Sequence, residues 1–369
     1  MKIDSDRVYL YRVAIDRAEA PFEVYRELAY CALSRLEFPI PETGTVLLKA
    51  NATILHPPET RIITHPGFVA GMIDVLVERG VDPARLAAGD GNAGDRPDRG
   101  FTWDVAGYRQ MLTERGARLA AMDRTESRDV AAPGGVVYRQ FPMYREVTDC
   151  GFFFDVPVAK CHNLVCTTLN IKNLMGTLDR PIRHLCGIQE VDKPFAEGYH
   201  RLTENGISLH EERFCHKLCD LLTALRSLGI PRLCMIDGLI GRDGTAFNEG
   251  DNYPLGWTLI GENEVHVDTV GTYLMGLDPL EAPYLRIAAG RGLGTNRVTE
   301  IEVVDLKSGQ ILDGEALKAH RSERVLMPVA RYQDGYYARF RSDGTVVPWR
   351  IDDVNRQRVE DGLEPISVA

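Results

Sequence analysis

The sequence lacks an excess of positive charge. It contains 43 lysines and arginines against 53 aspartates and glutamates, a formal net charge of −10. A nucleic-acid-binding surface needs clustered lysine and arginine, so we expect no nucleic-acid partner. No apolar run reaches transmembrane length, and Met1–Arg7 lacks the apolar core of a signal peptide. We therefore expect a cytoplasmic protein with no membrane partner, and a homo-oligomer is compatible with the sequence.

Several familiar catalytic and metal-binding motifs are also absent. The chain has no Gly-x-Ser-x-Gly elbow, no P-loop, no His-Glu-x-x-His and no Cys-x-x-Cys. The templates for serine hydrolases, nucleoside triphosphatases and closed structural zinc sites therefore do not apply. Eight cysteines in 369 residues do not indicate a disulfide scaffold, which favours reduced thiols.

Gly89–Gly94 matches the Gly-x-Gly-x-x-Gly pattern of a dinucleotide-binding site. That motif works only when its third glycine leads directly into a helix whose N-terminus faces the pyrophosphate. Here Asp95–Gly100 intervenes, and its aspartates would repel phosphate. We therefore expect neither NAD nor FAD, and we interpret the loop as one that presents Asp90 to a pocket.

Short apolar runs alternate with amphipathic segments along much of the chain. Thr45–Lys49 is a predicted strand, and Phe68–Arg79 is a predicted helix that Thr64 would cap. Two copies of a Glu-Arg-Gly segment each lead into a short strand, ending at Asp90 and Asp123. Strands alternating with helices of this length imply βαβ units. The sequence therefore predicts an α/β fold with a parallel or mixed, Rossmann-like sheet.

The composition, 44% hydrophobic and 26% charged, suits a protein with a large buried core. We expect residues 1–44 to form a strand and helix that pack on the core. Residues 45–319 would be the α/β core that carries the site, and 320–369 a C-terminal β extension with a hairpin turn at Ser342–Gly344. We also expect residues 240–256 to form a long functional loop, and Asp268 to cap a helix.

Side chains that can act in catalysis or binding are most concentrated in Asp155–His184, which begins in a predicted buried strand. Such strand ends are frequent ligand sites in α/β proteins. Lys160 and His162 are two positions apart, so they share a face of an extended backbone. Lys172 follows in apolar surroundings, where an ammonium group is costly unless it is paired or faces a ligand. We predict that His162, Lys172 and His184 are catalytic.

Other strand ends supply polar groups that would converge on this stretch. Ammonium, amide and imidazole groups near a helix N-terminus suit a carboxylate or phosphate. Asp90 and Asp237 would orient the cations or hold a metal, and His162 and His184 are the predicted metal ligands. Each residue taken alone also fits a hydrated strand end or a hydrogen-bonded core position. The predicted anion-binding residues are Lys49, Asn51, His65, Lys160 and Asn173.

The cysteines give a second, competing interpretation of the same stretch. Cys161, Cys166 and Cys186 could join the two histidines around zinc or iron, although their spacing matches no closed structural pattern. Cys215 and Cys219 lie one helical turn apart, and we expect them to be small core residues.

Several short sequence motifs occur in order from about residue 45 to residue 305. The most specific of them are Lys160-x-His162 and Lys172-Asn-x-x-Gly176. Together they resemble the family catalogued as domain of unknown function 362. Some members of that family carry an iron–sulfur module, whose cysteine pattern this chain lacks. The matching phrases are Leu48–Asn51, Thr64–Pro66, Gly89–Asp90, Val156–His162, Leu169–Gly176, Ile236–Gly238, Val267–Val270, Leu274–Gly276 and Gly292–Gly294.

The order His162, Lys172, His184 is also similar, more remotely, to a pattern in the nickel-dependent lactate racemase family. In that family the lysine tethers a nickel-pincer nicotinic-acid cofactor that accepts and returns a hydride. The resemblance implies that Lys172 would face such a cofactor.

We therefore predict an enzyme that acts on a small anionic metabolite. Its reaction would be racemisation, epimerisation or another hydride or proton transfer, with a divalent transition metal or a metal-containing cofactor as an option. Two alternatives stay open: a non-catalytic metal- or anion-binding protein, and an iron–sulfur or thiol redox protein.

Overall fold

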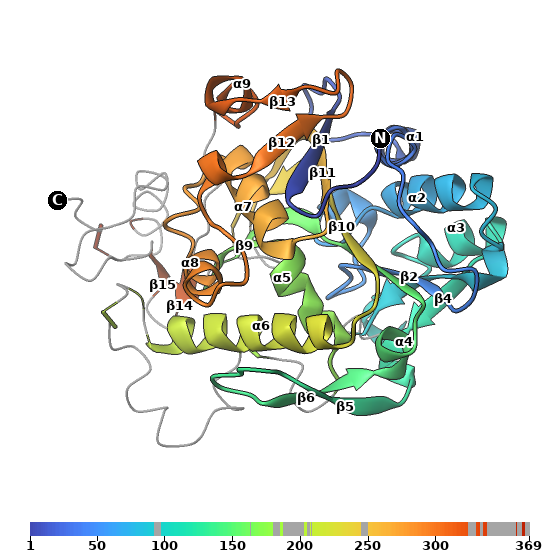
Figure 1. Ribbon diagram of the computed structural model, residues 1–369, viewed down its shortest axis with the longest axis horizontal. Helices are drawn as coiled ribbons and strands as arrows, with labels where there is room; N and C mark the ends of the chain where they lie inside the picture. Colours follow the sequence, from blue (N-terminus) through green and yellow to red (C-terminus); the bar gives the residue numbers. More distant parts are fainter. Residues whose placement is uncertain are drawn as a thin grey trace.

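The apolar runs of the chain come together in one central sheet of eleven strands (Figure 1). This computed structural model describes residues 1–91, 97–162, 164–179, 209–244 and 250–323, with short pieces at 185–186, 203–204, 207, 330–332, 335–337, 359 and 364–365. The strands alternate with helices through most of the chain. The predicted α/β fold with a parallel or mixed sheet is confirmed.

The sheet is mostly parallel at the side that carries the predicted site. The neighbours β10, β7, β2, β3 and β4 all run parallel, whereas β11 is antiparallel to both β10 and β1. β8 (Val158–His162) follows β7 and pairs with β10 and with β9 (Cys166–Thr168). In spatial order the other strands are β13 (Ile311–Leu312), β12 (Glu302–Asp305), β1 (Arg7–Arg12), β11 (Asn252–Gly261), β10 (Arg232–Arg242), β7 (Phe152–Val156), β2 (Val46–Ala50), β3 (Leu86–Asp90) and β4 (Arg118–Ala121).

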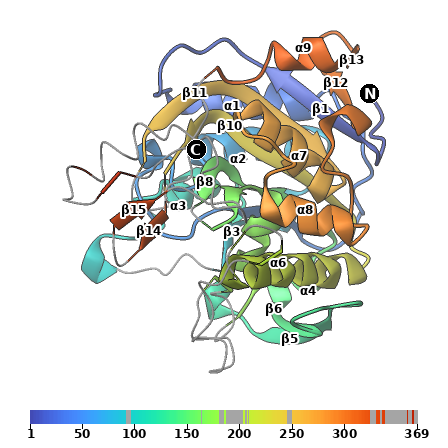
Figure 2. The same cartoon turned by 90° about the vertical axis from the view of Figure 1, so that its left-hand side faces the viewer.

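Helices cover both faces of this sheet. In Figure 2, α7 (Glu264–Leu274) and α8 (Pro283–Gly290) lie in front of the β10–β11 band and α2 (Pro66–Glu78) lies behind it. With α2 pack α1 (Phe22–Leu33) and α3 (Tyr108–Glu114), while α5 (Asn170–Asn173) and α6 (Leu209–Ser227) share the face of α7 and α8. The shorter elements are α4 (Arg145–Thr148), α9 (Gly314–Lys318), and the hairpins β5 (Ser127–Ala131) with β6 (Gln140–Tyr144) and β14 (Ala330–Tyr332) with β15 (Gly335–Tyr337).

Side-chain alternation explains why the sheet has two apolar cores. In β7, Phe152 and Phe154 enter the core beneath α1 and α2, whereas Phe153 enters the core beneath α5 to α8. A strand buried on both faces reads as a continuous apolar run, as Phe152–Val156 does. Within the described residues, no helix has both the length and the apolar character to cross a membrane.

Three local predictions were wrong. The side chain of His65, rather than Thr64, caps α2 by accepting a hydrogen bond from Gly67 N. Asp268 lies inside α7, whose cap is Asn263. The first and last parts of the predicted 240–256 loop belong to β10 and β11, which form a long antiparallel hairpin. The pattern was misleading because Gly241 and Gly256 of this segment lie within the strands themselves, where Gly241 pairs with Tyr253.

In the C-terminal region, β14 and β15 pair in antiparallel orientation. The predicted turn at Ser342–Gly344 lies outside the described residues.

Helices α1 and α2 approach so closely that two glycines are required between them. A Cβ at Gly71 would lie 2.1 Å from Arg26 O, and one at Gly67 would lie 2.5 Å from Phe22 O. Both obstacles are backbone atoms, which cannot move without displacing α1.

We expect Gly71→Ala to lower the free energy of unfolding by about 1–3 kcal/mol, because the added methyl group overpacks this contact. Gly290→Ala is the matched control: Gly290 ends α8 and a Cβ there meets nothing within 4 Å. Alanine should be neutral or stabilising at that position. Urea denaturation of both variants measures the difference, and equal stabilities would contradict the assigned helix contact.

Candidate functional site

The candidate site forms where β7, β2 and β3 end side by side. In the strand register, Lys49 of β2 lies between Asp155 of β7 and Gly89 of β3. Asp90 is the last residue of β3. Because side chains alternate along a strand, Lys49 and Asp155 point to the face of the sheet on which α5 lies.

The ammonium group of Lys49 is buried and has three acceptors. Its Nζ lies 3.1 Å from Asp90 Oδ1, 2.8 Å from Asn173 Oδ1 and 2.9 Å from Ala50 O. An ammonium group has three N–H donors, so these contacts use all of them. Asp90 is equally buried, and its Oδ2 accepts from Ala52 N at 2.7 Å. Lys49 therefore supplies the site with charge and with no further donor.

Asn173 connects this ion pair to the neighbouring strands. Its Nδ2 donates to Asp155 Oδ1 at 2.7 Å, and its Oδ1 also accepts from Asn51 Nδ2 at 3.0 Å. The Oδ1 of Asn51 accepts in turn from Lys160 Nζ at 2.7 Å, and Lys160 donates to Ile62 O at 2.5 Å. One continuous hydrogen-bond network thus crosses the ends of four strands.

Gly176 is required by the same ion pair. A Cβ at this position would lie 1.9 Å from Asp90 Oδ1 and 2.6 Å from Lys49 Nζ. Its carbonyl oxygen also accepts from Gly91 N at 3.0 Å, which ties the end of β3 to this turn. The motif Lys172-Asn-x-x-Gly176 therefore places the amide of Asn173 and a residue without a side chain, Gly176, against the buried Lys49–Asp90 ion pair.

The carboxyl group of Asp155 is only partly hydrogen-bonded. Its Oδ2 has no hydrogen-bond partner within the described chain. Burial raises the pKa of Asp155 well above its ordinary value, and the opposing effects of the Lys49 charge and the Asn173 hydrogen bond do not cancel this. Burial thus favours the neutral form of Asp155, and the charge of Lys49 is paired with Asp90.

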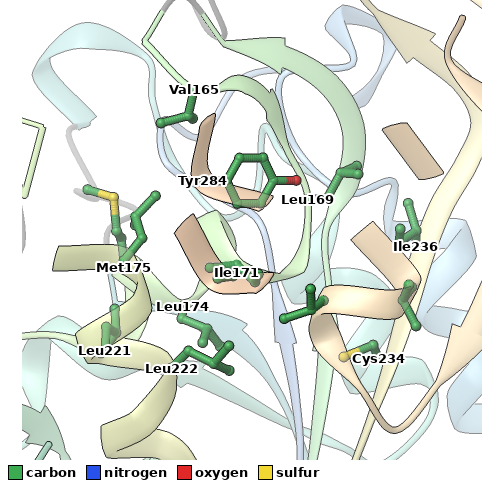
Figure 3. Close-up of a cluster of buried hydrophobic side chains, with 14 of the residues drawn as sticks. Val165, Leu169, Ile171, Leu174, Met175, Leu221, Leu222, Cys234, Ile236 and Tyr284 are labelled. Carbon is green, nitrogen blue, oxygen red and sulfur yellow. The ribbon is translucent and has the colours of Figure 1, made fainter. Parts of the chain in front are cut away.

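The short helix α5, which carries Lys172 and Asn173, is held by apolar contacts on its other side. Figure 3 shows Ile171 and Leu174 among buried side chains, with Leu174 next to Leu222 of α6. All three are completely buried. A four-residue helix is unstable alone, so this packing fixes its position.

Asp268 of α7 holds the first turn of α5. Its carboxylate accepts from Asn170 N at 2.8 Å, Asn170 Nδ2 at 2.7 Å and Ile171 N at 3.0 Å, and from Tyr284 OH at 3.3 Å. It therefore satisfies the N–H groups that α5 leaves unpaired at its start. The sequence analysis assigned Asp268 to the wrong helix, because a long-range cap has no local pattern.

Side chains from the ends of β2, β3 and β8 and from α5 line a partly open cavity of about 210 Å³. Lys172 reaches its wall from α5 and His162 from β8. Lys172 is half-buried, lies 5.9 Å from the centre of the Phe214 ring, and has no hydrogen-bond acceptor among the described residues. The lining residues are Lys49, Asn51, Thr53, Ile54, Asp90, Lys160, His162, Thr168, Lys172, Asn173, Met175, Gly176 and Cys186.

The electrostatics of the cavity favour unprotonated amines. Burial lowers the pKa of Lys160 well below its ordinary value, and the nearby charge of Lys172 lowers it further. Burial also lowers the pKa of Lys172, with a further contribution from the Lys49 charge. An anion in the cavity would reverse these effects, because it stabilises the protonated amines.

His162 lines the cavity in a defined tautomer. Leu164 N donates to His162 Nδ1 at 3.1 Å, so the neutral ring carries its proton on Nε2. In this form Nε2 is a hydrogen-bond donor. Ligation of a metal through Nε2 would require the other tautomer.

The described residues do not fit a metal ion. Over the described ranges, no group of three or more histidine, cysteine, aspartate or glutamate side chains could hold one. The cavity offers His162, Cys186 and an aspartate that already pairs with Lys49, and three lysine side chains oppose a cation. Cys161 and Cys166 are buried in the apolar core. The metal prediction thus depends on His184, which lies outside the described residues.

Two predicted site residues, His65 and Asp237, lie in a separate cluster. Asp237 Oδ2 accepts from Arg61 Nη2 at 2.7 Å and from His65 N at 3.0 Å. The ring of His65 stacks on Tyr25, with 3.8 Å between ring centres, and burial lowers the pKa of His65 to about 2. These contacts hold the start of α2 against β10, and neither residue lines the cavity.

Other residues of the site escaped the sequence analysis. Asp155 was the first residue of the selected stretch, yet the significance of a carboxyl group inside an apolar strand was missed. Cys186 was considered only as a possible metal ligand, and its position in the wall of the cavity was not predicted. Arg61 has no sequence signal, because its partner Asp237 is far away in the chain.

Comparison with known proteins agrees with the motifs on which the site is built. The sequence model for "Domain of unknown function (DUF362)" matches residues 46–273, from β2 to α7. The chain belongs to the DUF362 family. The matched range contains every described residue of the cavity wall.

The chain is also similar to "Thylakoid-associated protein sll1697" of Synechocystis sp., with 25% identity over 262 residues, which is 68% of each chain. Neither match concerns the nickel-dependent lactate racemases, so that remote likeness stays a prediction.

The burial of Asp268 gives a test by pH. Burial raises its pKa to about 7, from about 3.9 in an unfolded chain. Between these values the folded protein binds more protons than the unfolded one, so stability falls as pH rises, by about 1.4 kcal/mol per pH unit. Asp268→Asn removes this titration.

We therefore expect wild-type stability, measured by urea denaturation, to fall relative to Asp268→Asn as the pH is raised through this window. The exposed Asp98→Asn is the control. If the difference in free energy of unfolding between wild type and Asp268→Asn does not change with pH, Asp268 is ionised throughout this window.

We expect Arg61→Met to lower the free energy of unfolding by about 3–5 kcal/mol, because it leaves the buried Asp237 carboxylate uncompensated. The side chains of this pair are 1% and 0% exposed. Arg118→Met breaks the Arg118–Glu146 pair, whose arginine is 46% exposed, and should cost at most about 1 kcal/mol. Similar losses in both variants, measured by thermal and urea denaturation, would contradict this ranking.

Proposed function

We propose that this protein is an enzyme that binds a small anionic metabolite in the cavity beside α5. It would remove a proton from a carbon atom of that metabolite and return it. Racemisation or epimerisation next to a carboxylate is the reaction class that we favour. The observation that carries the proposal is the amine of Lys172, which reaches a cavity lined by two further lysines and has no acceptor within the described chain.

The contacts of the three lysines support different roles. Lys49 uses all its donors within the framework, whereas Lys160 donates to two acceptors and has one donor left when protonated. Lys160 would bind the carboxylate, and its charge would stabilise negative charge that develops beside that group. Lys172, with a pKa lowered by burial, would be the base.

His162 would polarise the substrate rather than accept its proton. A neutral imidazole that donates from Nε2 can stabilise an oxygen atom on which charge accumulates. The tautomer fixed by Leu164 N supports this role. The proposed reaction is proton transfer and not hydride transfer through a metal-containing cofactor, because the side chains of the described residues do not form a metal site.

We also propose that the protein acts in the cytoplasm, as its composition suggests. The eight cysteines all lie in the described part of the chain and form no disulfide, in agreement with a reducing compartment.

Proton exchange in deuterated water tests the enzyme. We would incubate the full chain with small 2-hydroxy, 2-amino and 2-oxo carboxylates and follow by NMR the C2–H signals of the first two classes and the C3–H signals of the third. At least one compound should lose its C–H signal, and Lys172→Met should slow this exchange by about 10²–10⁴-fold, as expected for loss of a general base.

Lys318→Met is the control, since that lysine is 64% exposed and distant in sequence from the site. Exchange that persists in Lys172→Met would refute the role of this residue. Binding of these compounds without any exchange would instead favour the non-catalytic anion-binding alternative.

A further inference from the structure

The three lysines of the cavity differ in what their amines contact. Lys49 has three acceptors and Lys160 has two. Lys172 contacts the face of the Phe214 ring and, among the described residues, no hydrogen-bond acceptor. A half-buried lysine amine that gains no acceptor from the protein is less well solvated as a cation than the same amine in water. Of these three amines, that of Lys172 is the one whose lone pair is available to a ligand.

An available amine in such surroundings is a nucleophile as well as a base. Lysines become nucleophilic when they are desolvated in an apolar pocket or lie next to other cations, and their usual partners are carbonyl compounds. Both conditions hold here: Phe214 covers one side of Lys172, and Lys49 and Lys160 line the same cavity.

The size and charge of the cavity restrict the carbonyl compound. About 210 Å³ is less than the roughly 300–1,000 Å³ of pockets for drug-sized ligands, so the compound has few carbon atoms. The remaining donor of Lys160 favours a carboxylate. A carboxylate bonded directly to the carbonyl carbon lets one small molecule meet both amines.

We propose that Lys172 forms an imine with the carbonyl group of a small 2-oxo carboxylate whose acid group lies against Lys160. This inference rests on the proposed function and names its substrate class. The imine activates the neighbouring C–H bond, because the electron pair left by the departing proton is delocalised into the C=N bond. Lys172 is then the nucleophile rather than the base of the proposed function, and the proton of the C3–H bond passes to water and returns from it.

The chemistry balances without any oxidant or reductant. The lone pair of the Lys172 amine attacks the carbonyl carbon and gives a carbinolamine. The C–O bond of this intermediate then breaks, one water molecule leaves and a C=N bond forms. The Nε2–H of His162 would stabilise the oxygen as it gains charge, and hydrolysis restores the amine.

Reductive trapping tests the imine on the full chain. The protein is mixed with pyruvate or with 2-oxobutyrate, and cyanoborohydride reduces any imine to a stable secondary amine. With pyruvate, the intact mass should rise by that of pyruvic acid less one oxygen atom. Peptide mapping should place this adduct on Lys172.

Two variants are the controls. Lys172→Arg keeps a cation in the cavity and cannot form an imine, so the adduct should be lost. Lys318→Arg changes an exposed lysine, and the adduct should persist. A mass increase that is equal in wild type and Lys172→Arg would overturn the proposal, since it would report unselective labelling.

Calorimetric titration with the same two compounds, and with acetate as a carboxylate without a carbonyl group, separates the two proposals. Binding of the oxo acids with no adduct on Lys172 would overturn the imine and leave the anion site intact. Absence of both binding and adduct with all three compounds would overturn the anion site as well. An adduct on Lys172 together with tighter binding of the oxo acids than of acetate supports both.

Discussion

A lysine ammonium buried between two parallel strands is the constraint on which the site depends. The charge of Lys49 must be balanced within the protein, since it has no access to water. Its acceptors come from the end of β3, from α5 and from its own strand, and Gly176 leaves the space that the ion pair occupies. The βαβ architecture brings these segments to one edge of the sheet, and the ion pair fixes their separation. A neutral residue in place of Lys49 would leave Asp90 buried without its partner.

Around this pair the structure divides the polar residues into two kinds. Asn51 and Lys49 both donate to Asn173, and Asp90 pairs with Lys49 and accepts from Ala52 N, so these side chains are fixed within the framework. Lys172 contacts an aromatic ring instead, and it is carried by a helix held from behind by Asp268 and by the apolar side chains of Figure 3. Precise placement of a helix that is only one turn long thus comes entirely from tertiary contacts, which suits a group that must meet a ligand in one orientation.

The fold and much of the site follow from local patterns in the sequence. Alternating apolar runs and amphipathic segments identify the parallel strands, and the two-residue spacing of Lys160 and His162 puts both on one wall of the cavity. Contacts between distant segments have no such signature. Nothing near Arg61 indicates that Asp237 will neutralise it, and nothing near Asp268 shows that it caps α5 rather than its own helix. Chemically similar residues such as Asp90 and Asp237, both predicted at strand ends, therefore could not be assigned to different clusters before the structure, in which Asp237 lies in the middle of β10.

The bare backbone at Gly176 bears on how sequences like this one are interpreted. In Lys172-Asn-x-x-Gly176, the asparagine and the glycine meet demands of packing and charge balance. The lysine lines the cavity and has no hydrogen-bond acceptor within the described part of the chain. A chain can thus preserve most of this signature for the sake of folding, whether or not it turns over a substrate. The residue at the first position is the better criterion: a family member that carries methionine or leucine there would be expected to fold in the same way and to be catalytically silent.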